Sequence, residues 1–243
     1  MLNINEYLDS TFLKTPLECK MKDLEYTSKV ESVIQEAIDY NFKLVMLRLQ
    51  YIPLAIKLIN DQKSKLLTGT VIDFPFGNSN TVKKIELAQE ALNYNVDDVD
   101  CVVDYKCFQK GDNDCLKKFQ DDIYYVSDLV LKQNKTIKWI IETGALEFKE
   151  INKMVVIIRD VFKARLHKYN ILNFFIKTST GYYRGTGAKI EDVKHIFSIS
   201  EGIPIKASGG IYNTKHALEM INNGASRIGT SKALDIILNK NNI

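Results

Sequence analysis

The sequence predicts an α/β fold, a single (β/α)8 TIM barrel, from three observations. Apolar runs of strand length alternate with stretches whose apolar residues recur at helical spacing, and eight such units can be counted. The length of 243 residues suits this barrel, which takes roughly 250. An open doubly wound sheet, the main rival, would carry a glycine-rich fingerprint after its first strand, and there is none. No proline- or serine-rich linker divides the chain, so we expect residues 1–243 to form one domain.

Eight segments have the short apolar character of strands that are buried on both faces. The first is closed by Thr15-Pro16, and several later ones run into polar or glycine residues where the chain would leave the sheet. In chain order, these expected strands, some with the loop that follows, are residues 7–14, 43–47, 70–77, 99–103, 137–144, 174–181, 203–207 and 225–231.

The segments between these strands carry apolar stripes of the kind that helices pack against a sheet. Pro53 opens the second of them, at a position where a helix tolerates proline, and a loop at Gly111 precedes the fourth. The stripes fall within residues 30–38, 54–59, 85–92, 116–130, 151–162, 190–197 and 217–221, and a last helix follows residue 231.

Composition and charge argue against several classes of function. The chain has 33 Lys+Arg against 30 Asp+Glu, and a net charge of +3 is too small to predict nucleic-acid binding. No uninterrupted apolar run approaches the ~20 residues of a membrane span, and the first six residues lack the features of a secretory signal. We therefore expect a cytoplasmic protein that binds neither nucleic acid nor membrane.

Cysteine and histidine supply no metal site in the sequence. Cys19, Cys101, Cys107 and Cys115 form no C-x-x-C pair and have no histidine at zinc-ligand spacing, so we expect reduced thiols and no metal. The three histidines are expected at the surface with no nucleophile beside them, which gives a Ser-His-Asp mechanism little support. Acid–base chemistry should therefore depend on lysine and carboxylate.

Ionisable residues inside or at the end of the apolar strands are the main functional candidates. The active site of such a barrel lies at the C-terminal ends of its strands, and an inward-pointing ionisable group must be paired or shifted in pKa. Any one of them could be a strand-end surface residue, but they come from several different strands. The candidates are Asp9, Asp100, Lys138, Glu142, Lys177 and Lys206.

Lys177 and Lys206, at the ends of adjacent expected strands, suggest a specific chemical device. If two lysine amines lie within several ångströms, each disfavours protonation of the other, and one can be neutral near pH 7. A neutral amine attacks a carbonyl to form a Schiff base, which permits cleavage or formation of an adjacent carbon–carbon bond. Asp100 with a bound water is the natural proton relay. Two plainer interpretations stay open: Lys177 reaches water at a strand end, or Asp100 only neutralises a buried lysine.

Two glycine-containing loops predict a phosphate group on the substrate. Phosphate sites in these barrels are frequently built from the loops after strands 7 and 8, which here are residues 208–210 and 229–231. Glycine lets backbone N–H groups approach an anion, and neighbouring hydroxyls donate to it. Either loop alone is an ordinary turn sequence, but their joint position favours phosphate.

Four motifs resemble those of the deoxyribose-phosphate aldolase family. They are residues 141–144 (IETG), 175–181 (FIKTSTG), 206–210 (KASGG) and 227–231 (RIGTS). They follow one another in the family's order, and the resemblance covers nearly the whole chain. It implies reversible cleavage of 2-deoxy-D-ribose 5-phosphate to D-glyceraldehyde 3-phosphate and acetaldehyde, without metal or cofactor.

The resemblance also implies roles for individual residues. Lys177 would form the Schiff base, Lys206 would lower its pKa, and Asp100 would relay protons. Members of the family are often homodimers and sometimes homotetramers. The implied substrate-binding residues are Asp9, Lys138, Thr178, Gly209, Gly210, Gly229 and Ser231.

The chain departs from the common form of the family in three places. The loop at residues 182–187 is one residue longer, and its Arg184 could contact phosphate or lie in solvent. Arg48-Leu49 stands where many relatives have Asn-Pro, and Ser10 stands where histidine is common. These changes concern the mouth of the barrel and leave the lysine pair intact.

A class I aldolase acting on 2-deoxyribose 5-phosphate is therefore the function that the sequence favours. One alternative keeps the Schiff base and changes the substrate, giving another phosphosugar aldolase or lyase. The other is a catalytically silent barrel that binds a phosphometabolite. A silent binder would have no need for a neutral amine, so the lysine pair favours an enzyme.

Overall fold

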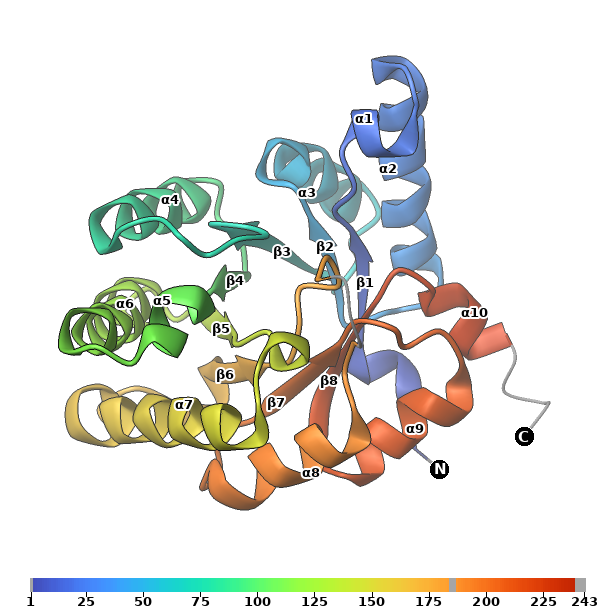
Figure 1. Ribbon diagram of the computed structural model, residues 1–243. Coiled ribbons are helices and arrows are strands. Elements are labelled where there is room, and N and C mark those ends of the chain that lie inside the picture. Colours follow the sequence, from blue (N-terminus) through green and yellow to red (C-terminus); the bar gives the residue numbers. More distant parts are fainter. Residues whose placement is uncertain (1, 184–186, 239–243) are drawn as a thin grey trace.

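The computed structural model describes residues 2–183 and 187–238 and shows a closed barrel of eight parallel strands surrounded by helices (Figure 1). Each strand pairs with the next one in sequence, and β8 pairs with β1 to close the cylinder. The strands are β1 (Leu8–Phe12), β2 (Leu44–Leu47), β3 (Leu67–Ile72), β4 (Asp98–Val102), β5 (Thr136–Ile140), β6 (Phe174–Lys177), β7 (Ile205–Ser208) and β8 (Ala225–Thr230).

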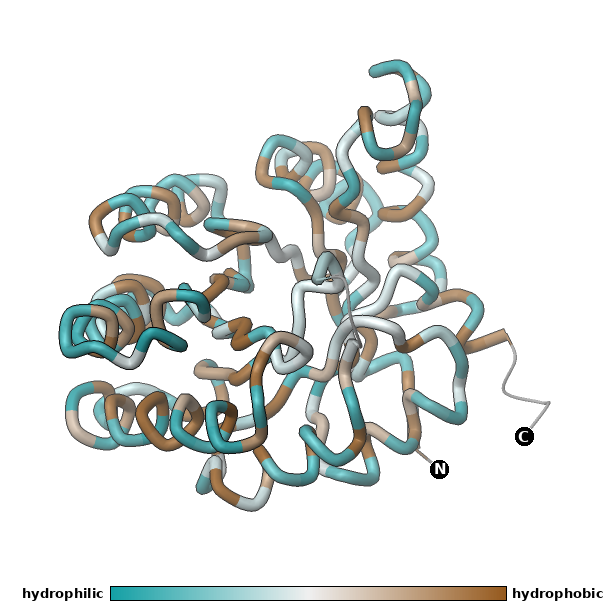
Figure 2. Tube along the Cα trace, in the orientation of Figure 1, coloured by the Kyte–Doolittle hydropathy of each residue, from teal (hydrophilic) through white to brown (hydrophobic). Residues whose placement is uncertain are grey.

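Helices connect the strands and cover the outside of the barrel. Hydrophilic and hydrophobic segments alternate along them in Figure 2, as expected for helices with one face on the barrel and the other in solvent. The helices are α1 (Pro16–Cys19), α2 (Asp23–Asp39), α3 (Ile52–Asp61), α4 (Thr81–Asn93), α5 (Tyr105–Lys110), α6 (Asn113–Leu131), α7 (Phe148–Val161), α8 (Ile190–Ile199), α9 (Thr214–Asn222) and α10 (Ala233–Leu238).

The strands are short, and both of their faces are buried. All four residues of β2 and all five of β4 are buried, and successive side chains point alternately into the barrel and toward the helices. Trp139 of β5 is fully buried in the layer under the helices, where its indole N–H donates to the Ser127 hydroxyl of α6 at 2.9 Å. The alternation leaves the other side chains of each strand to fill the barrel interior.

The predicted (β/α)8 fold is confirmed, and each of the eight expected strands overlaps an observed one. The third strand begins earlier than expected, at Leu67, and residues 73–77 lie in a loop, in keeping with the strand and loop expected over residues 70–77. Thr68, Gly69 and Thr70 lower the apolar character of this strand although all three are buried. The short helices α1 and α5 were not foreseen.

The expectation of four reduced thiols was wrong for two of them. Cys107 of α5 and Cys115 of α6 form a disulfide, with their Cα atoms 5.3 Å apart. Helix α5 ends at Gly111 in the left-handed conformation, so the chain reverses and brings the two cysteines together. Their separation of eight residues is not a C-x-x-C spacing, which is why the sequence pattern missed them. Cys19 and Cys101 are free.

No helix within residues 2–183 and 187–238 is long and apolar enough to cross a membrane.

A buried lysine outside the barrel interior fixes two of the loops above the strands. Lys84 of α4 is fully buried and donates to the Val102 carbonyl at 2.7 Å. Its amine also lies 3.4 Å from Asp73, in the loop after β3, and 3.3 Å from Asp122 of α6. Burial lowers the pKa of Lys84, but its interactions with Cys101, Asp122 and Asp73 outweigh burial, so the pKa is raised. Lys84 therefore holds α4, α6 and the ends of β3 and β4 in register.

We expect Lys84→Met to lower the free energy of unfolding by about 3–5 kcal/mol, because it breaks two buried ion pairs; Asp73 loses this cation, whereas Asp122 keeps Lys118 at 3.0 Å. Lys83→Met is the matched control, since Lys83 is an exposed neighbour whose pair with Glu86 should contribute no more than about 1 kcal/mol. Urea denaturation measures both. Equal, small losses for the two variants would contradict a structural role for Lys84.

Candidate active site

Seven charged side chains from six strands meet in the barrel interior, and all are buried. Such a concentration of charge is tolerated only where each group has a partner of opposite sign. The cations belong to β5, β6, β7 and β8, and the carboxylates belong to β1 and β4. The seven residues are Asp9, Asp98, Asp100, Lys138, Lys177, Lys206 and Arg227.

Six of the seven form a closed ring in which charges of opposite sign alternate. Asp100 accepts from Lys206 at 2.8 Å, and Lys206 lies 2.7 Å from Asp9. Arg227 donates to Asp9 from Nε at 2.8 Å and from Nη2 at 2.5 Å. The same Nη2 lies 3.4 Å from Asp98. The ring closes through Lys138, which lies 2.5 Å from Asp98 and 3.1 Å from Asp100.

Lys177 is the seventh charged group and lies outside this balanced ring. It is the last residue of β6, is only 3% exposed, and its Nζ donates to Oδ2 of Asp100 at 2.8 Å. Burial lowers the pKa of Lys177 to about 8; Asp100 opposes this shift, and the positive charge of Lys206 adds to it. An appreciable fraction of this amine is therefore neutral near physiological pH.

Lys206 lies beside Lys177 and keeps its proton. The two residues are paired in register on β6 and β7, and both amines lie 2.8 Å from the same Asp100 oxygen. The nitrogens can therefore be no farther apart than the sum of those two distances. Burial works against the charge of Lys206, but Asp100 and Asp9 together raise its pKa. Because Lys206 has two carboxylates and Lys177 shares one, Lys177 is the amine that loses its proton.

Asp100 joins three lysines from three neighbouring strands. Its two oxygens accept from Lys138, Lys177 and Lys206, and its side chain is fully buried. Burial alone would raise the pKa of Asp100, but these three cations hold it well below its usual value. Asp100 is thus a permanent carboxylate beside the reactive amine.

Asp98 and Arg227 were missed as site residues by the sequence reasoning, although a signal was present for one of them. Asp98 lies two residues before Asp100 on β4, and strand alternation places both side chains on the same face. Arg227, near the start of β8, was included only within a loop motif. Its pairing with Asp9 and Asp98 depends on the register of three strands that are distant in sequence.

Glu142, a candidate from the sequence, positions the loop that follows Lys177. Its backbone is in the left-handed region with φ of 56°. Its carboxylate accepts from the Thr180 backbone N–H at 3.2 Å and from the Thr180 hydroxyl. Burial raises the pKa of Glu142, and it makes no ion pair within the described part of the chain. Glu142 therefore anchors the end of the FIKTSTG segment.

The predicted phosphate loops follow β7 and β8, which pair with one another in the barrel. Gly209 and Gly210 have φ of 89° and 75°, a region that favours glycine. The backbone of Gly187 packs so closely on Gly209 that a Cβ on Gly187 would lie 2.2 Å from the Gly209 oxygen. Ser231 is exposed at the end of β8. The hydroxyl of Thr178 donates to the Ser208 carbonyl at 3.1 Å and so joins β6 to β7.

Gly229 provides the space through which the Lys206 side chain reaches Asp100. A Cβ built on Gly229 would lie 2.9 Å from Cε of Lys206 and 2.9 Å from Cβ of Ser208. Either contact is closer than real Cβ atoms permit, so a side chain here would displace the lysine. This explains a glycine in the middle of a buried strand, where it otherwise weakens the sheet.

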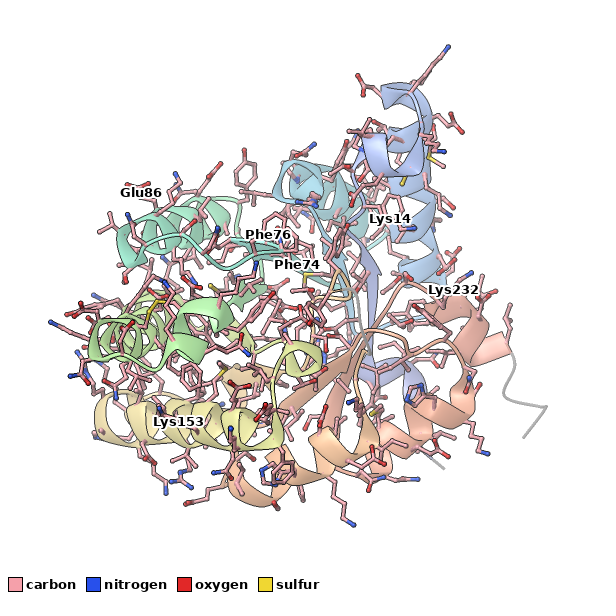
Figure 3. The ribbon with its side chains drawn as sticks, in the orientation of Figure 1. Lys14, Phe74, Phe76, Glu86, Lys153 and Lys232 are labelled. Atoms are coloured by element: carbon pink, nitrogen blue, oxygen red, sulfur yellow. A yellow bond between two sulfur atoms is a disulfide. The ribbon has the colours of Figure 1, made fainter. Side chains whose placement is uncertain are left out.

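Aromatic and charged side chains narrow the mouth of the barrel. The Tyr182 ring lies edge-on to Phe74 at 5.0 Å between centroids, and the Tyr182 hydroxyl donates to Glu18 of α1 at 3.4 Å. Arg48 donates to the Leu13 carbonyl at 2.8 Å and lies 5.6 Å from the Phe74 ring. Figure 3 shows Phe74 toward the middle of the view. The connections after β1, β2, β3 and β6 are thereby linked across one side of the mouth.

Arg184, for which a phosphate contact or a place in solvent was considered, lies outside the described residues, as do Gly185 and Thr186. No group of three or more His, Cys, Asp or Glu side chains within residues 2–183 and 187–238 could hold a metal ion.

Comparison with known proteins finds relatives that match almost the whole chain. It is 34% identical over 241 residues to a deoxyribose-phosphate aldolase of Mycoplasmopsis pulmonis (strain UAB CTIP), which covers 98% of this chain and 97% of the relative. A deoxyribose-phosphate aldolase of Finegoldia magna (strain ATCC 29328 / DSM 20472 / WAL 2508) is 33% identical over 237 residues, or 97% and 99% of the two chains. The chain belongs to the deoxyribose-phosphate aldolase family.

Membership of the deoxyribose-phosphate aldolase family confirms the resemblance seen in the motifs. The chain is accordingly an enzyme of the carbon–carbon lyase class. Among solved structures, an aldolase described as QR15 superposes with a TM-score of 0.80 at 28% identity, covering 97% of this chain and 95% of that one. No family model matches the chain.

We expect Gly229→Ala to lower kcat on the order of 100-fold, because the added methyl group moves the Lys206 amine away from Asp100. Ser226→Ala is the control, since Ser226 is an exposed residue of the same strand. Steady-state kinetics with 2-deoxyribose 5-phosphate measures both. A Gly229→Ala enzyme with unchanged kcat would show that Lys206 does not need this space.

Proposed function

We propose that Lys177 is the Schiff-base residue through which this chain cleaves 2-deoxy-D-ribose 5-phosphate to D-glyceraldehyde 3-phosphate and acetaldehyde. The observation that carries this proposal is a buried amine, outside a balanced ring of charges, whose pKa is lowered to about 8. Such an amine is both neutral often enough and sheltered enough to capture an aldehyde.

The reaction follows from the chemistry of that amine. The Lys177 nitrogen adds to the C1 aldehyde of the open-chain sugar, and loss of water leaves a protonated imine. Removal of the proton from the C3 hydroxyl then breaks the C2–C3 bond. The electron pair of that bond moves into the protonated imine and forms an enamine. Glyceraldehyde 3-phosphate leaves, C2 of the enamine takes up a proton, and water releases acetaldehyde from Lys177. The reverse sequence forms the bond.

Asp100 is proposed as the proton relay, acting with a water molecule. Its oxygen lies 2.8 Å from the Lys177 amine, so it is within reach of protons on the nitrogen and on an attached carbinolamine. Its very low pKa makes it a poor proton store, and a water held by its charge is the better carrier. Lys206 is proposed to keep Lys177 deprotonated and Asp100 in place.

Asp9 and Lys138 are proposed as substrate-binding residues that act by holding the ring of charged side chains in place. Both are fully buried and engaged in ion pairs, so direct contact with the sugar stays a prediction. The same holds for Thr178, whose hydroxyl joins β6 to β7. These residues fix the positions of the groups that face the substrate.

The phosphate of the substrate is proposed to bind where the loops after β7 and β8 meet. Gly209 and Gly210, which have left-handed backbones, are proposed to donate backbone N–H groups, and Ser231, exposed after the neighbouring strand β8, its hydroxyl. Gly229 contributes mainly by making room for Lys206. A phosphate held here places the sugar's far end at the side of the barrel adjacent to Lys177 on β6.

Several broader expectations are also proposals. Residues 1–243 are proposed to act as one catalytic domain that needs no cofactor and assembles as a homodimer or homotetramer. A cytoplasmic location, with no nucleic-acid or membrane partner, is proposed from charge and composition. Reduced cysteines would favour the cytoplasm, but the disulfide between Cys107 and Cys115 gives no such support.

We expect acetaldehyde and cyanoborohydride to fix a two-carbon adduct on Lys177, because reduction traps the imine at the residue that forms it. Peptide mass spectrometry locates the adduct. Lys177→Ala should abolish both the adduct and turnover, whereas Lys153→Ala, a change on the outer helix α7, should leave both intact. An adduct of equal yield in Lys177→Ala would reject the assignment.

We expect the turnover of the wild-type enzyme to rise about tenfold per pH unit below pH 8 and then to level off, as the Lys177 amine becomes neutral. Lys206→Met removes a neighbouring cation and so raises the pKa of Lys177, which shifts this rise to higher pH. A pH–rate profile for kcat/KM measures the shift. An unchanged midpoint in Lys206→Met would remove its electrostatic role.

A further inference from the structure

Arg227 is a buried cation at the opposite end of the barrel interior from the mouth. It borders a cavity of about 620 Å³ that is lined by residues from the beginnings of the strands, including Asp98, Thr136 and Ala225. Its guanidinium binds Asp9 through two nitrogens and faces Asp98. Arg227 makes no contact with Lys177 but closes the ring of charges from below.

We infer that Arg227 is a positioning residue for the aldol reaction. Arg227 binds Asp9 and Asp98 at the far end of the barrel, so these carboxylates do not balance the charge of Lys177, and in this way Arg227 sets the charge state of Lys177. This inference rests on the proposed role of Lys177.

The count of charges in the ring carries this inference. With Arg227 present, the six ring members are three cations and three carboxylates, so Lys177 is a surplus positive charge. Without Arg227, the three carboxylates would face Lys138, Lys206 and Lys177, and all three lysines could be charged together. In a buried cluster, the last cation without its own carboxylate is the one that gives up its proton.

The other charged groups nearby do not change this count. Glu6 and Lys43 line the same cavity as Arg227 but are exposed and outside the ring. Burial raises the pKa of Glu142, and Lys177 opposes that shift; the Glu142 carboxylate is hydrogen-bonded to Thr180 and forms no ion pair with the described ring residues, so it is not counted in the ring. The ring itself comprises Asp9 from β1, Asp98 and Asp100 from β4, Lys138 from β5, Lys206 from β7 and Arg227 from β8.

The test is a charge balance measured on the full-length enzyme. We expect Arg227→Met to move the midpoint of Lys177 reactivity up by about one pH unit, and so to lower imine trapping with acetaldehyde at pH 7 about tenfold. Asp98→Asn removes a negative charge while keeping nearly the same side-chain shape, and it should move the midpoint down. The double variant restores the surplus of one cation and should return toward the wild-type midpoint.

Two controls separate this effect from damage to the fold. Lys43→Met removes a cation from the rim of the same cavity and should leave the midpoint unchanged. Arg227→Lys keeps the positive charge and should bring the midpoint most of the way back to the wild-type value. Competitive acetylation of Lys177 across the pH range reads the neutral amine even where no imine forms. A wild-type enzyme with no adduct on Lys177 would defeat the proposed function itself.

With the wild-type adduct present, two results would overturn the role of Arg227. One is an unchanged midpoint in Arg227→Met. The other is a shift of Arg227→Met and Asp98→Asn in the same direction, which would indicate a loss of geometry. If Arg227→Met does not fold, the Asp98→Asn midpoint decides: a downward shift supports the charge balance, and no shift or an upward shift overturns it.

Discussion

The ion pairing of Asp100 with three lysines is the interaction on which the site depends. Two of those lysines, Lys138 and Lys206, are balanced through Asp9, Asp98 and Arg227 in a closed ring, and the third, Lys177, is not. The same carboxylate therefore holds the amine in place and does too little to keep it charged. The lowered pKa of Lys177 results from burial and an excess of one positive charge.

A barrel interior lined with charged groups has a desolvation cost, which the fold offsets by placing charges of opposite sign next to one another. Buried ion pairs contribute little net stability, since desolvation offsets most of their attraction, so a hydrophobic interior would serve folding equally well. Strand alternation aims the charged side chains of six strands inward, while Trp139 and its neighbours fill the apolar layer under the helices. Gly229 gives up a side chain so that Lys206 can reach the centre. These features fit the chemistry proposed at Lys177, whereas stability alone would not require them.

Much of this arrangement could be predicted from the sequence because it depends on patterns among residues that are close together in the chain. Alternating apolar runs and stripes gave the barrel, and ionisable residues ending buried strands pointed to Lys177, Lys206 and Asp100. Arg227 could not be recognised, because its partners Asp9 and Asp98 meet it only once β8 closes on β1. The Cys107–Cys115 disulfide likewise depends on a reversal between two short helices. Non-local pairing is what the patterns leave out.

The charge state of Lys177 in the unliganded enzyme is the most direct test of this account. Titration of the lysine side-chain ¹⁵Nζ resonances by NMR, with Lys177 assigned by its loss in Lys177→Arg, measures that state without any substrate. We expect Lys177 to titrate near pH 8, where burial and its neighbours place its pKa, while Lys206 stays protonated throughout the same range. A Lys177 that titrates at the ordinary lysine pKa of about 10.4, together with Lys206, would contradict the central claim.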